Sequence, residues 1–119
     1  MKNLRDLTVI IVTFHTPENI VLGCLRSINN DEVRVLIIEN SSTFIHEQKI
    51  KSEFSNVKII CTGENLGYGK GNNFGIQHAE SDYALILNPD VVCDKDFFSN
   101  ISKVINEAKD FSIIGCQYL

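Results

Sequence analysis

The stretch LTVIIVTF at residues 7–14 decides the fold. It is almost continuously apolar and rich in β-branched side chains, a pattern typical of a strand buried on both faces of a parallel sheet. A helix is expected directly after it, because Thr16 can serve as a hydroxyl N-cap and Pro17 suits the first helical position. Apolar residues then recur at helical spacing as far as Ile28. The chain therefore opens with a strand and a helix.

The same alternation of strand and helix continues along the chain. Further strands are expected at residues 33–38, 57–61, 83–87 and 111–116. Further helices are expected at about 45–54, 72–80 and 94–108, with a glycine-rich loop at 63–71. Five strands separated by four helices predict an α/β doubly wound, mostly parallel sheet in three layers, because right-handed crossovers impose parallel pairing. We expect strand order 3-2-1-4 and a single domain over residues 1–119.

Composition and charge exclude several classes of protein. Of the 119 residues, 44% are hydrophobic and 22% are charged, so a folded globular domain is expected rather than a disordered chain. The formal net charge of −4 argues against a nucleic-acid partner, because binding to a phosphate backbone needs a basic surface. No apolar run approaches the roughly 18 residues of a membrane helix.

The cysteines and the amino terminus indicate a cytoplasmic protein. The residues before the first strand contain no apolar signal-peptide core. The four cysteines form no C-x-x-C pair, and three lie in apolar segments, so reduced and mostly buried thiols are expected rather than zinc ligands or disulfides.

Polar segments follow each of the first four predicted strands. They occupy residues 13–16, 39–42, 63–73 and 88–90. In open α/β sheets, ligands bind outside the carboxyl ends of the strands, so these segments are the candidate site. Ordinary solvated loops are the alternative, since the loops of any α/β protein are polar.

The glycine-rich loop matches neither common nucleotide motif. Asn72 stands where a dinucleotide fingerprint needs its third glycine, and Gly71 follows Lys70 where a P-loop needs serine or threonine. Its glycines can adopt positive φ and let the backbone approach a ligand closely. The amides of Asn72 and Asn73 can then bind a sugar or a phosphate near a helix N-terminus. A flexible surface loop is the alternative.

The turn Asn88-Pro89-Asp90 ends the fourth predicted strand and presents a carboxylate. A strand-end carboxylate beside a side-chain oxygen suits Mg²⁺ or Mn²⁺, which proteins hold through one or two carboxylates and the substrate's phosphates. The alternative is a plain turn with Asp90 as a solvated cap. Asp94 and Asp96 are better explained as an N-cap and a first-turn residue of the next helix, and His46 and His78 as exposed surface residues.

Four segments together resemble the family 2 inverting glycosyltransferases, and most closely their rhamnosyltransferase-like branch. They are VIIVTFH at residues 9–15, ENSS at 39–42, N-x-G-Y-G-x-G-N-N-x-G at 65–75 and LNPD at 87–90. The resemblance covers about residues 7–118. It implies a Rossmann-like, GT-A-type domain that binds a nucleoside-diphosphate sugar, either a dTDP- or a UDP-sugar, for transfer to a glycan or lipid-linked acceptor.

The resemblance also implies roles for individual residues. Thr13 and Phe14 would line the nucleotide pocket, Glu39 would take the place of an aspartate that meets the base, and Asp90 would bind the metal. Tyr68 would either stack on a ring or cover the loop. The residues expected to contact substrate are Thr13, Phe14, His15, Glu39, Asn65, Gly67, Tyr68, Asn72, Asn73 and Asn88.

The sequence departs from the family pattern at three positions. Glu39 is one methylene longer than the usual aspartate, His15 replaces a frequent asparagine, and Asn88 is neutral where many relatives have a first aspartate. The family's catalytic base is expected beyond Leu119, so the chain is expected to be the donor half of a longer enzyme. In that longer protein a peripheral membrane location is also expected.

Two other functions remain open at this point. One is a nucleotide-sugar-binding module without turnover, and the other is a small flavodoxin-like or dinucleotide-binding domain, which the glycine spacing disfavours. Self-association is expected through an apolar edge near Ile113, Ile114 and Cys116, because unpaired apolar edges invite pairing.

Overall fold

Every residue of strand β1 (Leu7–Thr13) is buried, as the opening apolar run predicts. The computed structural model describes residues 4–107 of the chain. Within them β1 pairs in parallel with β2 (Arg34–Glu39) and with β4 (Tyr83–Ile86), and β2 pairs in parallel with β3 (Val57–Cys61). The sheet order is β3-β2-β1-β4, which confirms the expected order. The expected strand at 111–116 and the apolar edge assigned to it lie outside the described residues.

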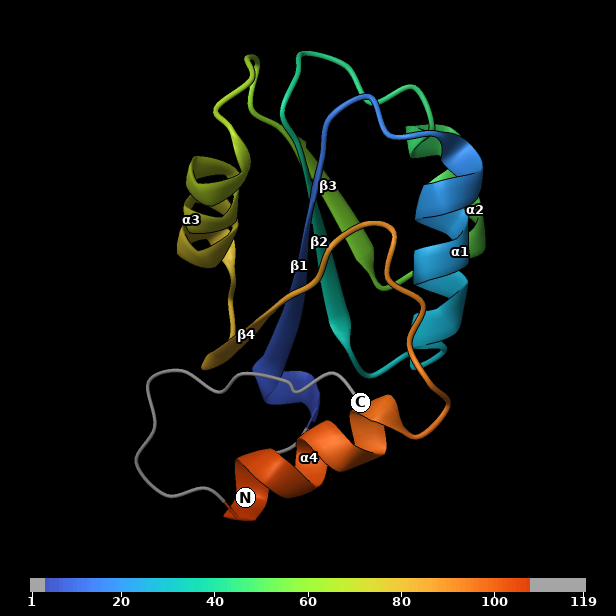
Figure 1. Ribbon diagram of the computed structural model, residues 1–119, viewed down its shortest axis with the longest axis vertical. Coiled ribbons are helices and arrows are strands. Elements are labelled where there is room, and N and C mark those ends of the chain that lie inside the picture. Colours follow the sequence, from blue (N-terminus) through green and yellow to red (C-terminus); the bar gives the residue numbers. More distant parts are fainter. Residues whose placement is uncertain (1–3, 108–119) are drawn as a thin grey trace.

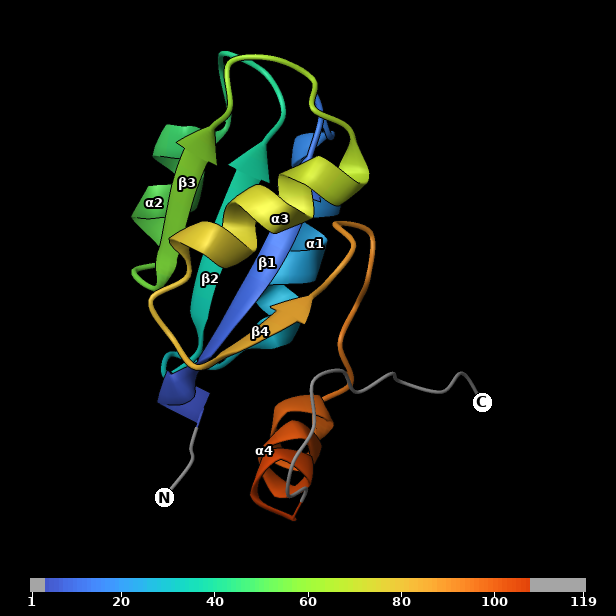
Figure 2. The same ribbon diagram turned by 90° about the vertical axis from the view of Figure 1, so that its left-hand side faces the viewer.

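Helices cover both faces of this sheet, which gives the predicted three-layer α/β fold (Figures 1 and 2). Helices α1 (Glu18–Ile28) and α2 (Glu47–Glu53) lie on one face, and α3 (Tyr68–His78) lies on the other. A short 3₁₀ turn, Leu4–Asp6, precedes β1, and α4 (Phe97–Glu107) lies beyond the amino end of the sheet.

The side chains of the central strands alternate between two hydrophobic clusters. Val9 and Ile11 of β1 join the large cluster under α1 and α2, to which α4 adds Phe98 and Ile105. Ile10 and Val12 join the smaller cluster on the other face, against which Phe74 of α3 packs. This two-residue alternation explains the continuous apolar run, since both faces of β1 are covered.

Helix α3 begins at Tyr68, four residues before the predicted start, so part of the expected glycine loop is helical. Gly63 and Gly67 use the freedom to adopt positive φ, at 90° and 84°, whereas Gly69 and Gly71 lie in the helix. A Cβ on Gly75 would lie 2.5 Å from Ile10 Cγ2. Glycine therefore serves this helix by allowing close packing on the sheet as well as by shaping the loop before it.

The predicted caps of two helices are also corrected. Pro17 is the N-cap of α1, and the Thr16 hydroxyl instead accepts a hydrogen bond from the Phe14 N–H at 3.4 Å. Helix α4 begins at Phe97, so Asp94 and Asp96 precede it, and the Asp96 carbonyl accepts the Asn100 N–H at 3.0 Å. Strand β2 ends at Glu39, one residue later than predicted.

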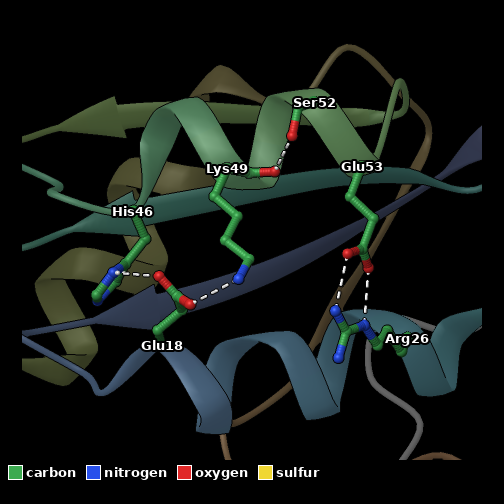
Figure 3. A network of polar contacts seen from close by, with 6 residues as sticks. All are labelled: Glu18, Arg26, His46, Lys49, Ser52 and Glu53. Carbon is green, nitrogen blue, oxygen red and sulfur yellow. Dashed lines mark hydrogen bonds and ion pairs between the residues drawn. The ribbon is translucent and has the colours of Figure 1, made fainter.

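Ion pairs join α1 to α2 at two points along their length (Figure 3). Glu18 meets His46 Nδ1 at 3.4 Å and Lys49 Nζ at 3.1 Å, while Arg26 and Glu53 form a bidentate pair with both distances at 2.8 Å. The His46 side chain is 14% exposed, and its Nε2 lies 3.1 Å from the Thr16 carbonyl oxygen. The prediction of an exposed His46 is therefore wrong, because the ring fills the junction between the two helices.

No helix within residues 4–107 combines the length and the apolar character that crossing a bilayer requires.

Candidate functional site

The ends of three neighbouring strands lie level at the carboxyl edge of the sheet. Thr13 is the register partner of Glu39, and Glu39 is the register partner of Cys61. The segments that leave these strands run along one end of the molecule, at the top of Figure 1. Strand β4 is shorter: it pairs with β1 only as far as Ile10, three positions before Thr13, and the Leu87 N–H donates to the Ile10 carbonyl at 3.0 Å. The segments after β1, β2 and β3 therefore meet at one edge, and the segment after β4 reaches the start of α3 through Asn88, which accepts a hydrogen bond from Tyr68.

Glu39 forms a buried hydrogen-bonded cluster at this edge. Its side chain is 1% exposed. Oε1 accepts the Thr13 hydroxyl at 2.8 Å, and Oε2 accepts the Ser41 hydroxyl at 2.6 Å and the His15 backbone N–H at 3.3 Å. Thr13 is equally buried at 1%. The carboxylate thus ties the end of β1 to the end of β2 below the surface.

Phe14 and His15 form the exposed turn above this cluster. The Phe14 side chain is 51% exposed, and its ring centroid lies 4.4 Å from that of His15. His15 has a φ of 51°, in the left-handed region that few non-glycine residues adopt. The turn offers an aromatic surface and backbone groups to a ligand.

Asn40 anchors the glycine-rich loop and is a residue that the sequence reasoning missed. It is 2% exposed, its Nδ2 donates to the Gly67 carbonyl at 2.9 Å, and its Oδ1 accepts the Thr62 hydroxyl at 3.2 Å. Asn65 adds an Asx turn, because its Oδ1 accepts the Gly67 N–H at 3.0 Å. A signal for Asn40 was present, since an amide directly after a buried strand needs partners.

Helix α3 directs its amino terminus to the same edge. Gly67 is its N-cap, with a φ of 84° and no side-chain hydrogen bond to cap the first turn. The prediction that Asn72 and Asn73 open the helix is wrong, because both lie in its second turn. Asn73 is exposed. Asn72 is only 7% exposed, and its Oδ1 is buried without a hydrogen-bond partner among residues 4–107.

Tyr68 and Asn88 join α3 to the segment after β4. The Tyr68 hydroxyl donates a short hydrogen bond to Asn88 Oδ1, although the Tyr68 side chain is 52% exposed. Asp90 follows two residues later and is exposed. The Asn88 carbonyl accepts a weak hydrogen bond from the Cys24 thiol at 3.9 Å, and burial raises the pKa of that thiol to about 12.

The donor set at Asp90 fits a metal that is shared with a ligand. In the described part of the chain, no group of three or more His, Cys, Asp or Glu side chains is placed to hold a metal by itself. One exposed carboxylate, such as that of Asp90, can hold Mg²⁺ or Mn²⁺ when phosphate oxygens and water complete the coordination. The residues thus fit a cation that binds together with a diphosphate.

Three hollows of about 350, 280 and 470 Å³ lie away from this edge. They surround the amino ends of β2 and β3, and none is lined by a predicted site residue. The aromatic side chains of Phe14 and Tyr68, which belong to the predicted site, are about half exposed.

The sheet order and the polar carboxyl edge define a Rossmann-like α/β domain of the kind that commonly binds nucleotides. The chain belongs to glycosyl transferase family 2, whose family model matches residues 8–118. This membership confirms the family resemblance of the sequence motifs.

Curated relatives span several transferases. The chain is 29% identical over 120 residues to the low-salt glycan biosynthesis hexosyltransferase Agl10 of Haloferax volcanii, covering 98% of this chain and 38% of Agl10. It is 25% identical over 99 residues to the rhamnosyltransferase WbbL of Escherichia coli K12, covering 76% of this chain and 37% of WbbL. The chain thus spans less than two fifths of the length of either relative.

Solved structures share the fold. TarS 1–349 of S. aureus superposes with a TM-score of 0.72 at 23% identity, covering 85% of this chain and 32% of that one. The structure of TarS 1–349 in complex with UDP gives a TM-score of 0.71 over the same shares. At 23% identity this structural similarity shows a shared fold and nothing about the ligand.

Proposed function

We propose that the chain is the donor-binding part of a glycosyltransferase that moves a sugar, with inversion, from a nucleoside-diphosphate sugar to a glycan or lipid-linked acceptor. The observation that carries the proposal is the meeting of the segments after β1, β2 and β3 at one edge of the sheet, with the segment after β4 joined to the start of α3 by the Tyr68–Asn88 hydrogen bond. Phe14 and His15 follow β1, Asn65 and Tyr68 come from the loop and start of α3, and Asp90 follows β4.

Each part of a nucleoside-diphosphate sugar has a chemically suitable partner at this edge. The exposed rings of Phe14 and Tyr68 suit the faces of a base or a sugar. The uncapped start of α3 suits the negative charge of the diphosphate. The exposed amide of Asn73 suits sugar hydroxyls, which can both donate and accept. The UDP bound by TarS supports a UDP-sugar, and a dTDP-sugar is the second donor proposed.

Asp90, with Asn88 beside it, would hold Mg²⁺ or Mn²⁺ against the diphosphate. A bound cation supplies charge neutralisation for the nucleoside diphosphate as it leaves. The Tyr68 hydroxyl fixes the Asn88 side chain next to this position. We assign no general base to these 119 residues, and the rhamnosyltransferase-like branch is supported by WbbL alone among the relatives named above.

The proposal also covers the cellular location of the enzyme and its self-association. We propose a cytoplasmic enzyme that sits at the membrane surface when its acceptor is lipid-linked, and self-association through the apolar segment at residues 111–116. Light scattering at high protein concentration tests the association. A monomer under those conditions contradicts it.

Calorimetric titration of the chain with UDP and with dTDP, each with and without MnCl₂, tests the function. Saturable binding that strengthens with Mn²⁺ is expected for at least one of the two nucleotides. No binding of either contradicts the proposal. Incubation with the matching sugar donors and an acceptor then separates a transferase from a binding module, which binds the donor and transfers nothing.

A further inference from the structure

Asp90 lies in a connecting segment without regular secondary structure. Residues 88–96 form neither strand nor helix, and they lead from β4 to α4. The turn around Asp90 is closed by a backbone hydrogen bond from the Val91 N–H to the Asn88 carbonyl at 3.1 Å. Since the segment belongs to no strand ladder, the position of the Asp90 carboxylate depends on the contacts that the segment makes with other elements.

The first end of this segment is held by the start of α3. The Tyr68 hydroxyl donates to Asn88 Oδ1. Tyr68 directly follows Gly67, the N-cap of α3, so the bond ties the segment to the helix start that is proposed to receive the diphosphate. Asp90 is two residues away from this tie.

The second end is held by Ser27 of α1, a residue that lies outside every motif of the sequence. Its hydroxyl donates to the Cys24 carbonyl at 2.6 Å within the helix, and its oxygen accepts the Cys93 N–H at 2.8 Å. The hydroxyl proton is used inside α1, and the lone pairs remain available for the Cys93 amide. The segment accordingly runs beside α1 (Figures 1 and 2).

Cys24, one helical turn before Ser27, contacts the same segment. Its thiol lies 3.9 Å from the Asn88 carbonyl oxygen. Burial raises the pKa of this thiol, with smaller contributions from Cys93 and Asp90, so both residues lie near it. This side of α1 therefore supports residues 88–93, while the Asp90 side chain between the two ends is exposed.

We propose that Ser27 is a positioning residue for Asp90: its hydrogen bond to Cys93, with the Tyr68–Asn88 bond at the other end, orders residues 88–93 and so presents the Asp90 carboxylate to a cation that arrives with the diphosphate. Ordering a binding group in advance lowers the free-energy cost of binding. The proposal rests on the proposed function, and it adds to the site a residue of α1 that acts through Asp90.

Calorimetry of Ser27→Ala with UDP or dTDP, whichever the chain binds, tests this role with and without MnCl₂. The affinity with Mn²⁺ is expected to fall about fivefold, as the loss of one hydrogen bond allows, and the affinity without Mn²⁺ to stay within about twofold of native. Ser27→Thr keeps the hydroxyl and is expected to keep the Mn²⁺ effect.

Ser52→Ala is the matched control. The Ser52 hydroxyl donates to the Lys49 carbonyl, three residues earlier in α2, at 2.7 Å (Figure 3). It thus makes the same bond inside a helix as Ser27, and within residues 4–107 it accepts no amide from another segment. We expect Ser52→Ala to bind the nucleotide as the native chain does, with and without Mn²⁺.

Tyr68→Phe tests the other end of the segment at a half-exposed position, where the fold does not depend on the hydroxyl. The substitution keeps the ring and removes the bond to Asn88. We expect the same selective loss of affinity with Mn²⁺ as in Ser27→Ala. A ring that only stacks on the ligand predicts native affinity in both conditions, and this result would overturn the role of the hydroxyl.

Amide hydrogen exchange of Val91 gives a readout that needs no ligand. The Val91 N–H bonds within the turn and not to Ser27, so its exchange rate reports the order of the segment rather than the loss of one acceptor. Exchange is expected to be faster in Ser27→Ala than in the native chain and unchanged in Ser52→Ala. A native exchange rate at Val91 in Ser27→Ala would overturn the proposal.

The binding outcomes separate this role from the proposed function. Native chain that binds neither nucleotide contradicts the proposed function, and exchange at Val91 then still decides whether Ser27 orders the segment. Native binding that Mn²⁺ does not strengthen contradicts the cation site and the positioning role together. Native binding that Mn²⁺ strengthens, with an unchanged Mn²⁺ effect in Ser27→Ala or an equal loss with and without Mn²⁺, leaves the proposed function standing and overturns the positioning role.

Discussion

The side-chain amide of Asn40 donates a hydrogen bond to the carbonyl oxygen of Gly67 at 2.9 Å. This bond connects the end of a central strand to the N-cap of α3, across 27 positions of sequence. Gly67 has a φ of 84°, so the chain turns sharply at the point that Asn40 holds. The loop and the helix start that face the candidate ligand are thereby fixed to the rigid centre of the sheet.

Asn40→Ala should destabilise the fold and weaken nucleotide binding together. The substitution removes the bond to the Gly67 carbonyl and the bond from the Thr62 hydroxyl, each worth about 0.5–1.5 kcal/mol net, while the Gly71 N–H and the Glu64 carbonyl remain as partners of those two groups. Chemical denaturation measures the free energy of unfolding. Gln77→Ala, at an exposed position of α3, is the control and should change it little. Equal stability of Asn40→Ala and the native chain would show that the loop is held by other contacts.

Gly75→Ala should destabilise the protein, whereas Gly69→Ala should not. A Cβ on Gly75 meets Ile10 Cγ2 at 2.5 Å and Ile38 Cγ1 at 3.3 Å, and overpacking of this kind costs about 1–3 kcal/mol. Apart from neighbouring backbone of its own helix, a Cβ on Gly69 would meet nothing within 4 Å, so alanine there should be neutral or stabilising. Thermal unfolding compares the two variants. A similar melting temperature for both would contradict the close packing of α3 on β1.

Asp90→Ala should abolish the Mn²⁺-dependent part of nucleoside-diphosphate binding and leave the fold intact. The carboxylate is exposed, so its removal leaves no cavity in the core. Asp82→Ala, which removes an exposed carboxylate before β4, should preserve the Mn²⁺ effect. Calorimetry with and without MnCl₂ measures the difference. The same metal dependence in Asp90→Ala would show that Asp90 is a turn residue only.

Cys24 and Cys61 should differ in their reactivity toward alkylating reagents. Burial raises the pKa of the Cys24 thiol from 9.0 to about 12, and Cys24 is 1% exposed, whereas Cys61 is exposed. Iodoacetamide should therefore modify Cys61 well before Cys24, as peptide mass spectrometry can measure. Early modification of Cys24 in the folded chain would contradict its burial.

The same pKa shift predicts how stability changes with pH. The Cys24 thiol ionises near pH 9.0 in the unfolded chain and only near 12 in the folded chain. The stabilisation from its protonated form is complete below pH 9, and the free energy of unfolding should fall as the pH rises from about 9 to about 12. Cys24→Ala should flatten this decline. The same fall in the free energy of unfolding in Cys24→Ala would show that other ionisable side chains cause it.

The fold was predictable because its strongest signals are local. The apolar run of β1 and the repeated alternation of strand and helix predicted the sheet, and the position of the site followed from parallel pairing, which places every strand's carboxyl end on one edge. Asp90 was predicted to lie at that edge from its position in the chain alone, whereas β4 ends opposite Ile10, three positions before Thr13. The role of Asp90 as a metal ligand remains a prediction.

The errors concern features that depend on tertiary contact. Glycine disfavours helices in isolation, so the start of α3 at Tyr68 was missed. Further along the same helix, the close approach of Gly75 to Ile10 explains why position 75 needs glycine. Asn40 was missed because its partner Gly67 is distant in sequence. The Glu39 carboxylate depends on three donors, of which Thr13 and His15 come from the end of β1 and Ser41 from its own segment, and no sequence pattern specifies this set.

The most direct test of the central claim is a titration of the ¹⁵N-labelled chain with UDP, and separately with dTDP, in the presence of MgCl₂, followed by amide shifts. We predict saturable shift changes that cluster at residues 13–16, 39–42, 65–73 and 88–90, with none at residues 29–34 and 54–57 around the hollows of the opposite edge. Shift changes confined to that opposite edge, or no saturable change with either nucleotide, would contradict the assignment of the carboxyl edge as the donor site.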